Sequence, residues 1–352
     1  MKIMHVTEAM GGGVQNAISK YTQILPHANH VVVGRPRHGE ESGEFSDDTQ
    51  VIEFRGNLVQ FLVKIRRTIL TERPDVVHLH SSLAGLARPL VPRAVPIAYS
   101  PHCYAFERRD RSVLWRTTLR AAEWTLALRQ QTLIAVSPHE ADLGRALNPK
   151  MAVHYVPNVL TAEGIPSSKP LRPTVSMVGR IGAQKDPGLF AAVARTCGRD
   201  IDFTWIGDGD PHLKQQLLDA GVTVSGWVDP REARRLVASS DLYLHTGSWE
   251  SAPISAMEAA AAGVPVIARR IPTMESLGYF TASESVTDLA RAVQRFFTDD
   301  AFQRTVSLTT SNMVGLLTAD EARRSLETAY TDACKGQQSL GTRSSEGALY
   351  EN

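Results

Sequence analysis

Short β-rich segments alternate with helical segments along the 352-residue chain, which predicts an α/β protein with parallel sheets. The alternation pauses at Thr161–Pro173, a stretch rich in Pro, Ser and Gly without an apolar period, and then resumes. A chain of this length is too long for one ordinary core and suits two domains. We therefore predict two Rossmann-like, doubly wound parallel-sheet domains facing across a cleft, over residues 1–165 and 166–318. A further helix should cover 319–335, and the polar tail 336–352 should be disordered.

Apolar runs of strand length and apolar positions at helical spacing give the individual elements. In the first half the expected strands are Lys2–Thr7, His30–Val33, Val51–Phe54, Val76–His80, Val95–Ser100, Thr132–Val136 and Val153–Val156, with helices at Val14–Leu25 and Leu58–Leu70. In the second half the expected strands are Thr174–Val178, Ile201–Ile206, Val222–Ser225, Leu242–Leu244 and Val264–Ala268. Helices should lie at Pro187–Arg195, Pro211–Ala220, Pro230–Ser239, Pro253–Ala262 and Ala319–Cys334.

Composition restricts the class of protein. Hydrophobic residues make up 43% and charged residues 21%, as in soluble globular proteins, and the net charge of +1 gives no global attraction to nucleic acid. Three widely separated cysteines argue against a disulfide framework, and no Cys/His cluster has zinc-ligand spacing. Since no signal-peptide or transmembrane pattern is present, we expect a cytoplasmic protein, and peripheral contact with the cytoplasmic face of the membrane stays open.

The segment 249–259 carries two carboxylates, Glu250 and Glu258, across the expected entry of a helix. Pro253 suits the first helical position, where its missing N–H costs nothing. The exposed N–H groups of such a helix start can hold a phosphate. One carboxylate, an anion site and a second carboxylate then follow one another. This order matches the sugar hydroxyls, diphosphate and ribose hydroxyls of a sugar nucleotide.

Glycine and basic residues follow other expected strands. Gly12 and Gly13 stand between the first strand and the first helix, where glycines let a ligand approach the backbone; a plain tight turn is the alternative. The dinucleotide fingerprint fails because Asn16 replaces its third glycine, and no P-loop pattern occurs. Arg180 and Lys185 lie on one loop and could clamp a diphosphate, or could be solvated surface cations.

Two further loops and one histidine carry weaker signals. Gly207 closes the strand Ile201–Ile206 in what could be only a turn with a helix cap. Trp227 and Val228 could flank a base ring, although a buried structural tryptophan accounts equally well for Trp227. His102 follows the strand ending at Ser100 and could orient a hydroxyl, or be structural. The histidines His78 and His80 should pack or form hydrogen bonds rather than bind metal.

The stretch 106–129 is rich in arginine. Helical spacing would place Arg109, Arg116 and Arg120 on one face, which could meet anionic lipid or a lipid-diphosphate acceptor. A solvated helix with intrahelical ion pairs is the alternative.

Together these loops resemble the retaining glycosyltransferases of family four, which have the GT-B fold. The strongest signal is the pair Glu250 and Glu258 followed by 260–268, and the next is Gly179-Arg180 with Gln184-Lys185-Asp186. The segments 75–80 and 156–158 also look like family segments. Ser251 stands where relatives often have Gly, and 270–275 lacks a Gly-Gly common in relatives.

The resemblance implies roles for individual residues. Arg180 and Lys185 would bind the donor diphosphate, Glu258 the ribose, and Glu250 the hydroxyls of the donor sugar. Backbone N–H groups around Ala252, Pro253, Ile254 and Ser255 would hold phosphate or sugar oxygens. Gly12 and Gly13 would approach the diphosphate from the other domain. His102 would face the transferred sugar. The last helix would cross back to the first domain, as in relatives.

The expected activity is transfer of a hexose from a nucleoside-diphosphate sugar to a saccharide or lipid-linked acceptor in the synthesis of capsule, exopolysaccharide or another cell-surface glycan. We expect a UDP-linked donor; GDP and dTDP remain open, because all three share the diphosphate that these residues would bind. No Asp-x-Asp cluster stands where one would hold a metal at the diphosphate, so we expect no metal and no cofactor. A sugar-nucleotide epimerase or hydrolase, and a non-catalytic nucleotide-sugar-binding subunit, remain open as alternatives.

Overall fold

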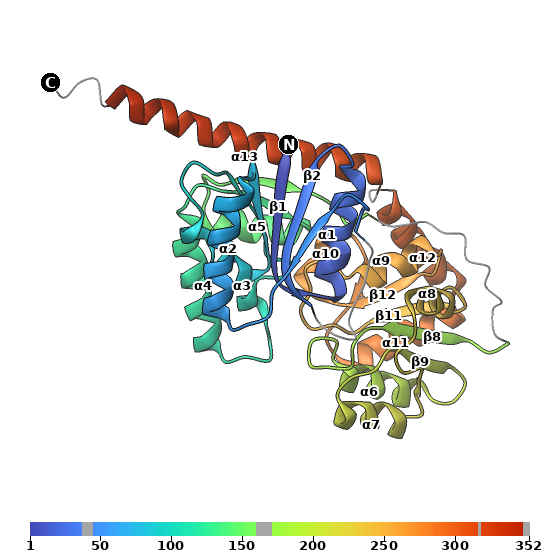
Figure 1. The fold of residues 1–352 in the computed structure, drawn as a ribbon. Coiled ribbons are helices and arrows are strands. Elements are labelled where there is room, and N and C mark those ends of the chain that lie inside the picture. Colours follow the sequence, from blue (N-terminus) through green and yellow to red (C-terminus); the bar gives the residue numbers. More distant parts are fainter. Residues whose placement is uncertain (37–44, 160–170, 316–317, 348–352) are drawn as a thin grey trace. The chain divides into compact units, whose positions relative to one another are not determined.

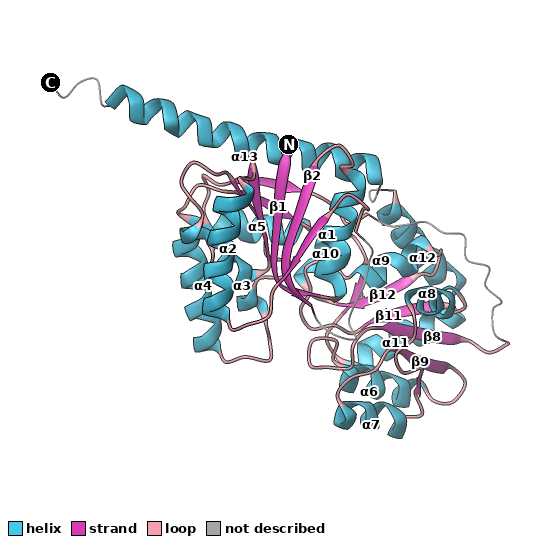
Figure 2. Ribbon diagram, in the orientation of Figure 1, coloured by secondary structure: helices cyan, strands magenta, loops and turns pink. Residues whose placement is uncertain are grey.

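A computed structural model describes residues 1–36, 45–159, 171–315 and 318–347. The chain forms two compact units. Unit 1 comprises Met1–Glu107, Arg111–Val159 and Ala319–Asn352, and unit 2 comprises Arg108–Asp110 and Leu160–Thr318. The expected linker Thr161–Pro173 lies mostly outside the described residues. Each unit is a parallel sheet with helices packed on it, as Figure 2 shows, so the predicted class of two parallel-sheet α/β domains is confirmed.

Sheet 1 forms the centre of unit 1, with strand order β3-β2-β1-β4-β5-β6-β7. The strands are β1 (Lys2–Met10), β2 (Asn29–Pro36), β3 (Gln50–Glu53), β4 (Val76–His80), β5 (Ile97–Ser100), β6 (Thr132–Ala135) and β7 (Ala152–Tyr155). The helices are α1 (Gly12–Ile24), α2 (Leu58–Glu72), α3 (Ser82–Gly85), α4 (Val113–Ala127), α5 (Pro138–Leu147) and α13 (Ala319–Gly347), with 3-10 turns η1 (Arg88–Leu90) and η2 (Ala105–Glu107). This strand order is the Rossmann order with one added strand.

The two faces of sheet 1 are covered by different helices (Figure 1). Met4 and Val6 of β1 pack with Phe61 and Ile65 of α2, while Ile3, on the other face, packs with residues of α1 and α13. His5 has the same parity as Ile3, because side chains alternate along a strand. The face below α1 and α13 therefore carries polar as well as apolar side chains.

The last helix is longer than predicted. We expected a helix over 319–335 and a disordered tail over 336–352, but α13 continues to Gly347. The physical reason is that no proline interrupts 319–347, so nothing breaks the ladder of backbone hydrogen bonds. Residues 348–352 lie outside the described part of the chain.

Sheet 2 forms the centre of unit 2, with strand order β10-β9-β8-β11-β12-β13. The strands are β8 (Thr174–Val178), β9 (Asp202–Ile206), β10 (Thr223–Val224), β11 (Leu242–His245), β12 (Val266–Arg269) and β13 (Phe280–Ala282). The helices are α6 (Pro187–Cys197), α7 (Pro211–Asp219), α8 (Pro230–Ala238), α9 (Ile254–Ala261), α10 (Pro272–Ser276), α11 (Val286–Thr298) and α12 (Asp300–Val314). Proline begins several of these helices, with an aspartate cap before α6, α7 and α8.

Candidate functional site

The predicted donor-binding residues of unit 2 follow the carboxyl ends of its strands. The loop after β8 carries Arg180 and Lys185, the loop after β9 begins at Gly207, and the loop after β11 carries Glu250. In a parallel α/β sheet, ligands bind outside the carboxyl ends of the strands. The loops after β8 and β11 are adjacent because β8 and β11 are paired in the sheet.

Lys185 and Glu250 form the centre of this edge. The Lys185 Nζ lies 2.6 Å from Glu250 Oε1, and the two side chains are only 18% and 7% exposed. Gln184 donates from Nε2 to the Trp249 carbonyl at 3.0 Å and to Glu250 Oε2 at 3.3 Å. The structure thus brings together two residues that were predicted as separate contacts of the donor, and it makes them partners of each other.

Glu250 is ionised. Burial opposes its charged form, but the Lys185 ammonium and His245 outweigh burial and lower the pKa of Glu250 to about 2. His245 Nε2 lies 3.6 Å from Glu250 Oε1, too far for a hydrogen bond. Burial lowers the pKa of His245 itself, so the charge that balances Glu250 is that of Lys185.

The start of α9 lies directly after this pair. Pro253 was expected at the first helical position, which is wrong: with ψ 100° it is the residue before the helix, and α9 begins at Ile254. A ψ of 100° is extended rather than helical, so the helix begins one residue later than the sequence pattern suggests. No side chain caps this helix start and its first turn has no acidic residue, so it is suited to an anion.

The remaining predicted residues of this segment are also placed. Ala252 is buried and Ser255 is half-buried, with its Oγ accepting a hydrogen bond from Tyr243 at 2.9 Å. Glu258 is half-buried on α9, and its Oε1 lies 3.9 Å from Arg234 Nη1 of α8. At that distance the pair is a loose ion pair rather than a hydrogen bond.

Two glycine-containing loops touch backbone to backbone. A Cβ built on Gly207, whose φ is +136°, would lie 2.4 Å from the Gly179 carbonyl oxygen. The same carbonyl accepts a hydrogen bond from Trp205 Nε1 at 2.8 Å. Gly207 is therefore required by this close approach, and its role as a ligand contact stays a prediction.

The outer residues of this edge are accessible. Arg180 is exposed, Val228 is half-buried, and Trp227 is 59% exposed. The alternative that Trp227 is a buried structural residue is wrong; Trp205 has that role, since its side chain is fully buried. Trp227 follows β10 by three residues, and an exposed indole there can stack on a planar ring.

In unit 1 the predicted residues lie at the carboxyl edge of sheet 1. Gly12 and Gly13 begin α1 and are exposed, and Gly12 has a φ of +56°, the left-handed region that favours glycine. His102 follows β5 and its Nε2 lies 2.9 Å from His80 Nδ1. His78 and His80 are fully buried and hydrogen-bonded, as predicted.

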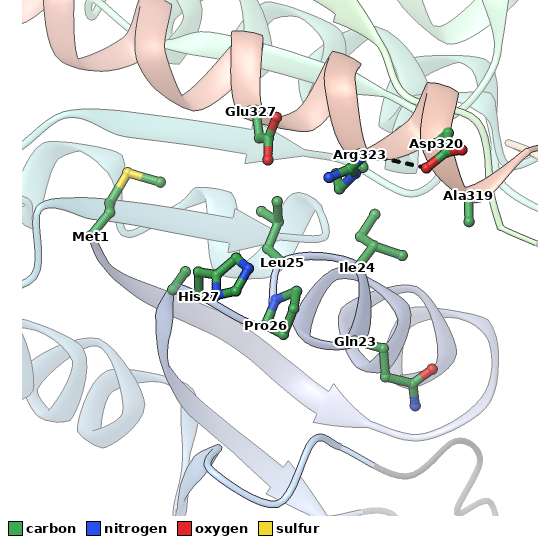
Figure 3. Close-up of a pocket in the computed structure, with 11 residues that line it drawn as sticks. Met1, Gln23, Ile24, Leu25, Pro26, His27, Ala319, Asp320, Arg323 and Glu327 are labelled. Atoms are coloured by element: carbon green, nitrogen blue, oxygen red, sulfur yellow. Dashed lines mark hydrogen bonds and ion pairs between the residues drawn. The ribbon is translucent and has the colours of Figure 1, made fainter.

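A pocket of about 480 Å³ lies elsewhere in unit 1 (Figure 3). Its lining comes from Met1, from 23–28 at the end of α1, and from the first turns of α13, including Arg323 and Glu327. Met1 precedes β1, so this pocket is at the amino end of the strand, away from the edge where ligands of parallel sheets bind. It contains none of the predicted site residues.

The arginine-rich stretch differs from its prediction. Since α4 begins at Val113, Arg109 precedes the helix and cannot share a helical face with Arg116 and Arg120. Ser112 caps α4 by accepting from the Trp115 N–H, which sets this start. Arg116 donates to the Phe106 carbonyl at 2.9 Å, and the guanidinium of Arg120 lies 5.7 Å from the centre of the Phe106 ring.

Sequence reasoning missed three residues of the unit 2 edge. His245 lies beside Glu250, Arg234 lies beside Glu258, and Thr273 donates from Oγ1 to the Glu250 carbonyl at 2.6 Å. His245 is the last residue of β11, and this position was a signal that could have identified it. Arg234 and Thr273 lie within helices and carry no comparable signal.

Among the described residues, no helix has both the length and the apolar character needed to span a membrane.

Two family models together match most of the chain. Residues 12–163 match the family model described as Glycosyltransferase Family 4, and residues 172–299 match that described as Glycosyl transferases group 1. The chain is 27% identical over 302 residues to a 41.2 kDa protein of the cps region of Klebsiella pneumoniae, covering 78% of this chain and 82% of that protein. It is 23% identical over 316 residues to the UDP-Gal:alpha-D-GlcNAc-diphosphoundecaprenol alpha-1,3-galactosyltransferase of Escherichia coli, covering 77% and 80%.

Solved structures share the fold. Sucrose-phosphate synthase from Thermosynechococcus elongatus superposes with a TM-score of 0.81 at 16% identity, covering 94% of this chain and 98% of that one. Anabaena HepE in complex with UDP and glucose gives a TM-score of 0.71 at 16% identity, covering 94% and 100%. With its two parallel-sheet domains and its two matching family models, the chain belongs to the family-four, or group 1, glycosyltransferases of the GT-B fold.

Proposed function

We propose that this glycosyltransferase moves a hexose from a UDP-sugar to a lipid-linked saccharide acceptor, with retention of configuration at the anomeric carbon, in the synthesis of a cell-surface polysaccharide. The observation that carries the proposal is the buried pair of Lys185 and Glu250 next to the uncapped start of α9. This arrangement offers an oriented ammonium and backbone N–H groups at one place.

The reaction needs positive groups at the leaving group. When the bond between the anomeric carbon and the phosphate oxygen breaks, negative charge grows on the nucleoside diphosphate, and fixed donors aimed at that charge lower the barrier. Lys185 has three N–H donors, of which Glu250 Oε1 engages one, so the ammonium can also bind phosphate. Arg180 on the same loop and the start of α9 add to this, and we propose that no metal is needed.

Retention follows from attack on the same face as the departing phosphate. The acceptor hydroxyl forms a bond to the anomeric carbon while the carbon–phosphate-oxygen bond breaks, and the hydroxyl proton passes to the departing phosphate oxygen. No protein carboxylate takes part in this bond exchange. Glu250 serves by holding Lys185 and by accepting from sugar hydroxyls, and Glu258 by accepting from the ribose.

The relatives guide the choice of donor and acceptor. The Escherichia coli relative is named for a UDP-galactose donor and a diphosphoundecaprenol-linked acceptor, and HepE was crystallised with UDP. The Klebsiella pneumoniae relative is encoded in a capsule region. We therefore assign a UDP-hexose as donor and a saccharide on a polyprenyl diphosphate as acceptor.

A lipid-linked acceptor requires access to a membrane surface. The helix α4 exposes Val113 and Leu114 at 72% and 77%, and Trp124 further along, and Leu128 directly after the helix is also exposed. Arg111 and Arg120 are exposed close to these apolar side chains. We propose that α4 contacts an anionic lipid surface, which exposed apolar and basic side chains together favour.

The test is a transfer assay with UDP-galactose, UDP-glucose and GDP-mannose, each with and without a synthetic GlcNAc-diphosphate-polyprenol, with and without EDTA. We expect UDP release only with the acceptor, undiminished by EDTA, and an α-linked product by NMR. Equal donor cleavage without acceptor would identify a hydrolase. Donor binding without turnover for any acceptor tried would favour a non-catalytic subunit, and an inverted product would refute same-face attack.

A further inference from the structure

Five histidines of unit 1 lie together on the face of sheet 1 that α1 and α13 cover; four of them are hydrogen-bonded to one another, and the ring of His78 lies against that of His80, with centroids 3.8 Å apart. His30 of β2, His5 of β1, and His78 and His80 of β4 are buried, and His102 after β5 is half-buried. They come from four adjacent strands, because sheet 1 places β2, β1, β4 and β5 side by side. The parallel register pairs His5 with His78 and Thr7 with His80.

Four of these rings form a continuous chain of contacts. His30 Nε2 lies 3.0 Å from the Leu25 carbonyl oxygen, and His30 Nδ1 lies 3.1 Å from His5 Nε2. His5 Nδ1 lies 3.0 Å from His80 Nε2. His80 Nδ1 in turn lies 2.9 Å from His102 Nε2.

The rings are neutral at physiological pH. Burial lowers the pKa of His5 and His80 well below the usual range, and the neighbouring histidines lower it further. Burial also lowers the pKa of His30, and it lowers the pKa of His102 to about 4. A neutral imidazole has one donor nitrogen and one acceptor nitrogen.

The hydrogen bonds along this row of four histidines can run in only one direction. A carbonyl oxygen only accepts, so His30 must donate from Nε2 to Leu25, and its Nδ1 must accept. His5 then donates from Nε2 and accepts at Nδ1, and His80 does the same. His102 consequently donates from Nε2 to His80, which leaves its Nδ1 with a lone pair.

We propose that His30, His5 and His80 are positioning residues that hold His102 in its Nε2–H tautomer, so that His102 Nδ1 accepts a hydrogen bond from a sugar hydroxyl of the substrate. The part about the sugar rests on the proposed function; the tautomer does not. The ligand group facing His102 must then be a donor, which a hydroxyl is and a phosphate oxygen is not.

The backbone at His102 supports a functional role for this ring. His102 and Cys103 both have positive φ values, 48° and 84°, a conformation that side chains disfavour. The Cys103 N–H donates to Glu140 Oε1 at 2.8 Å, which holds the strained segment. Successive strained residues at the end of a strand are kept where a side chain must be aimed.

A metal ion is the competing explanation of the cluster. Ligand atoms of His5, His78 and His80 lie within 4.8 Å of one another. However, the chain already uses both nitrogens of His5 and His80, and His78 meets Tyr330 at 2.8 Å and Ser100 at 2.9 Å. A metal would have to replace these hydrogen bonds, so we assign the cluster to the tautomer chain.

The first test needs no variant. In protein labelled with ring ¹⁵N-histidine, long-range ¹H–¹⁵N spectra at pH 7.5 distinguish protonated from bare ring nitrogens. We expect Nε2–H and bare Nδ1 for His30, His5, His80 and His102, with His102 assigned from the spectrum of His102→Asn. An Nδ1–H tautomer at His102, or copurified zinc bound by these rings, would overturn the inference.

The second test removes His30, the first ring of the histidine chain. His30→Leu takes away the acceptor of His5 while leaving His102 intact, and we expect His102 to lose its single tautomer. The kcat/KM for the UDP-sugar should fall by about fivefold, the value of one neutral hydrogen bond. His30→Asn, whose amide can both accept and donate, should restore part of the loss.

The matched control is His27→Leu, because His27 is exposed and lies three residues before His30. It should behave like the wild type in both measurements.

If folded His30→Leu keeps the wild-type tautomer at His102, the positioning role is refuted. If His30→Leu does not fold, the wild-type spectrum still decides the tautomer. The expected tautomer in an enzyme without transfer activity would refute the proposed function and leave the tautomer chain intact.

Discussion

The carboxyl edges of the two sheets are built from opposite kinds of polar group. In unit 2 the centre is an ion pair, Lys185 with Glu250, and the pKa of Glu250 is about 2, since the Lys185 ammonium outweighs the effect of burial. In unit 1 the centre is a chain of uncharged imidazoles, in which burial lowers the pKa of His102 to about 4. One edge is organised by charge and the other by the direction of hydrogen bonds.

Because of this difference, substitutions should affect the two edges in different ways. Removing one member of an ion pair leaves the other charge buried without compensation. Removing one imidazole from the chain leaves no charge, but the remaining rings lose the partner that fixes their tautomer. Substitutions should therefore be costly for stability in unit 2 and should mainly disturb orientation in unit 1.

Lys185→Met should have the largest effect, because it leaves the Glu250 carboxylate buried without its ammonium. We expect the free energy of unfolding to fall by about 3–5 kcal/mol, measured by urea denaturation. Lys150→Met, at an exposed lysine of unit 1, is the control and should leave stability unchanged.

The double variant Lys185→Met/Glu250→Gln separates stability from catalysis. Neutralising both members should recover most of the stability, whereas turnover should stay lower by about 10²–10³-fold, the cost of one lost donor at the developing charge. Wild-type turnover in the double variant would show that Lys185 has only a structural role. A single variant as stable as the wild type would contradict the importance of the ion pair.

Acid should distinguish the two units. The buried histidines have folded-state pKa values below their unfolded value, so the unfolded chain binds more protons between pH 6.5 and about 4. Their contribution to stability is complete above pH 6.5 and is lost as the pH falls through this window. Glu250 contributes in the same direction, but only between pH 4.5 and about 2.

Two neighbours of the histidine chain oppose this loss. Burial raises the pKa of Glu140 to about 7, and Glu107 raises that of His139 against the effect of burial, so both bind protons more tightly in the folded state. Five histidines, including His30, bind protons less tightly in the folded state, whereas these two groups bind them more tightly. We therefore expect unit 1 to lose stability on the order of 3 kcal/mol between pH 7 and 5.5. Thermal unfolding at both pH values would measure this loss of stability, with the signals of these histidines reporting on unit 1 and the Trp227 signal on unit 2. Equal destabilisation of both units would contradict the comparison.

Much of the fold and part of each edge could be predicted from the sequence. Lys185 and His102 were identified because each follows a segment with a clear strand pattern, and Glu250 because it stands just before an expected helix start. The strands themselves were found close to their observed bounds, except β13, which was not predicted. In parallel sheets that position is sufficient to place a residue at the ligand-binding edge.

Which of these residues contact one another could not be predicted in the same way. Lys185 and Glu250 are 65 residues apart, and His5 meets His80 across 75 residues. Such contacts depend on which strands are neighbours, and the sequence pattern of one strand does not contain that information. The same limit explains why His5 and His30, which lie inside strands rather than after them, were not recognised.

Tyr330→Phe should have a moderate effect on unit 1. Ser100 donates from Oγ to the Ile134 carbonyl at 2.7 Å, so His78 donates to Ser100 and accepts from the Tyr330 hydroxyl of α13. Without that hydroxyl a buried acceptor is left unpaired, at a cost of about 1–3 kcal/mol, measured by thermal unfolding. Tyr155→Phe, at a half-buried tyrosine of the same unit, is the control and should cost less. Equal losses of stability in the two variants would show that the hydrogen bond from Tyr330 of α13 to His78 of sheet 1 does not stabilise the protein.

Arg180→Ala tests the ion pair against an exposed cation on the same loop. Because Arg180 is exposed while Lys185 is largely buried, its loss should leave stability unchanged and raise the KM for the UDP-sugar by about tenfold at low salt. Salt screens exposed charges more than buried ones. The difference between Arg180→Ala and wild type should therefore shrink as ionic strength rises from 0.02 to about 0.5 M, whereas the turnover defect of the Lys185→Met/Glu250→Gln variant should persist. If salt reduced both defects equally, burial would not be what separates the two cations, and Lys185 would have to be regarded as a second exposed contact.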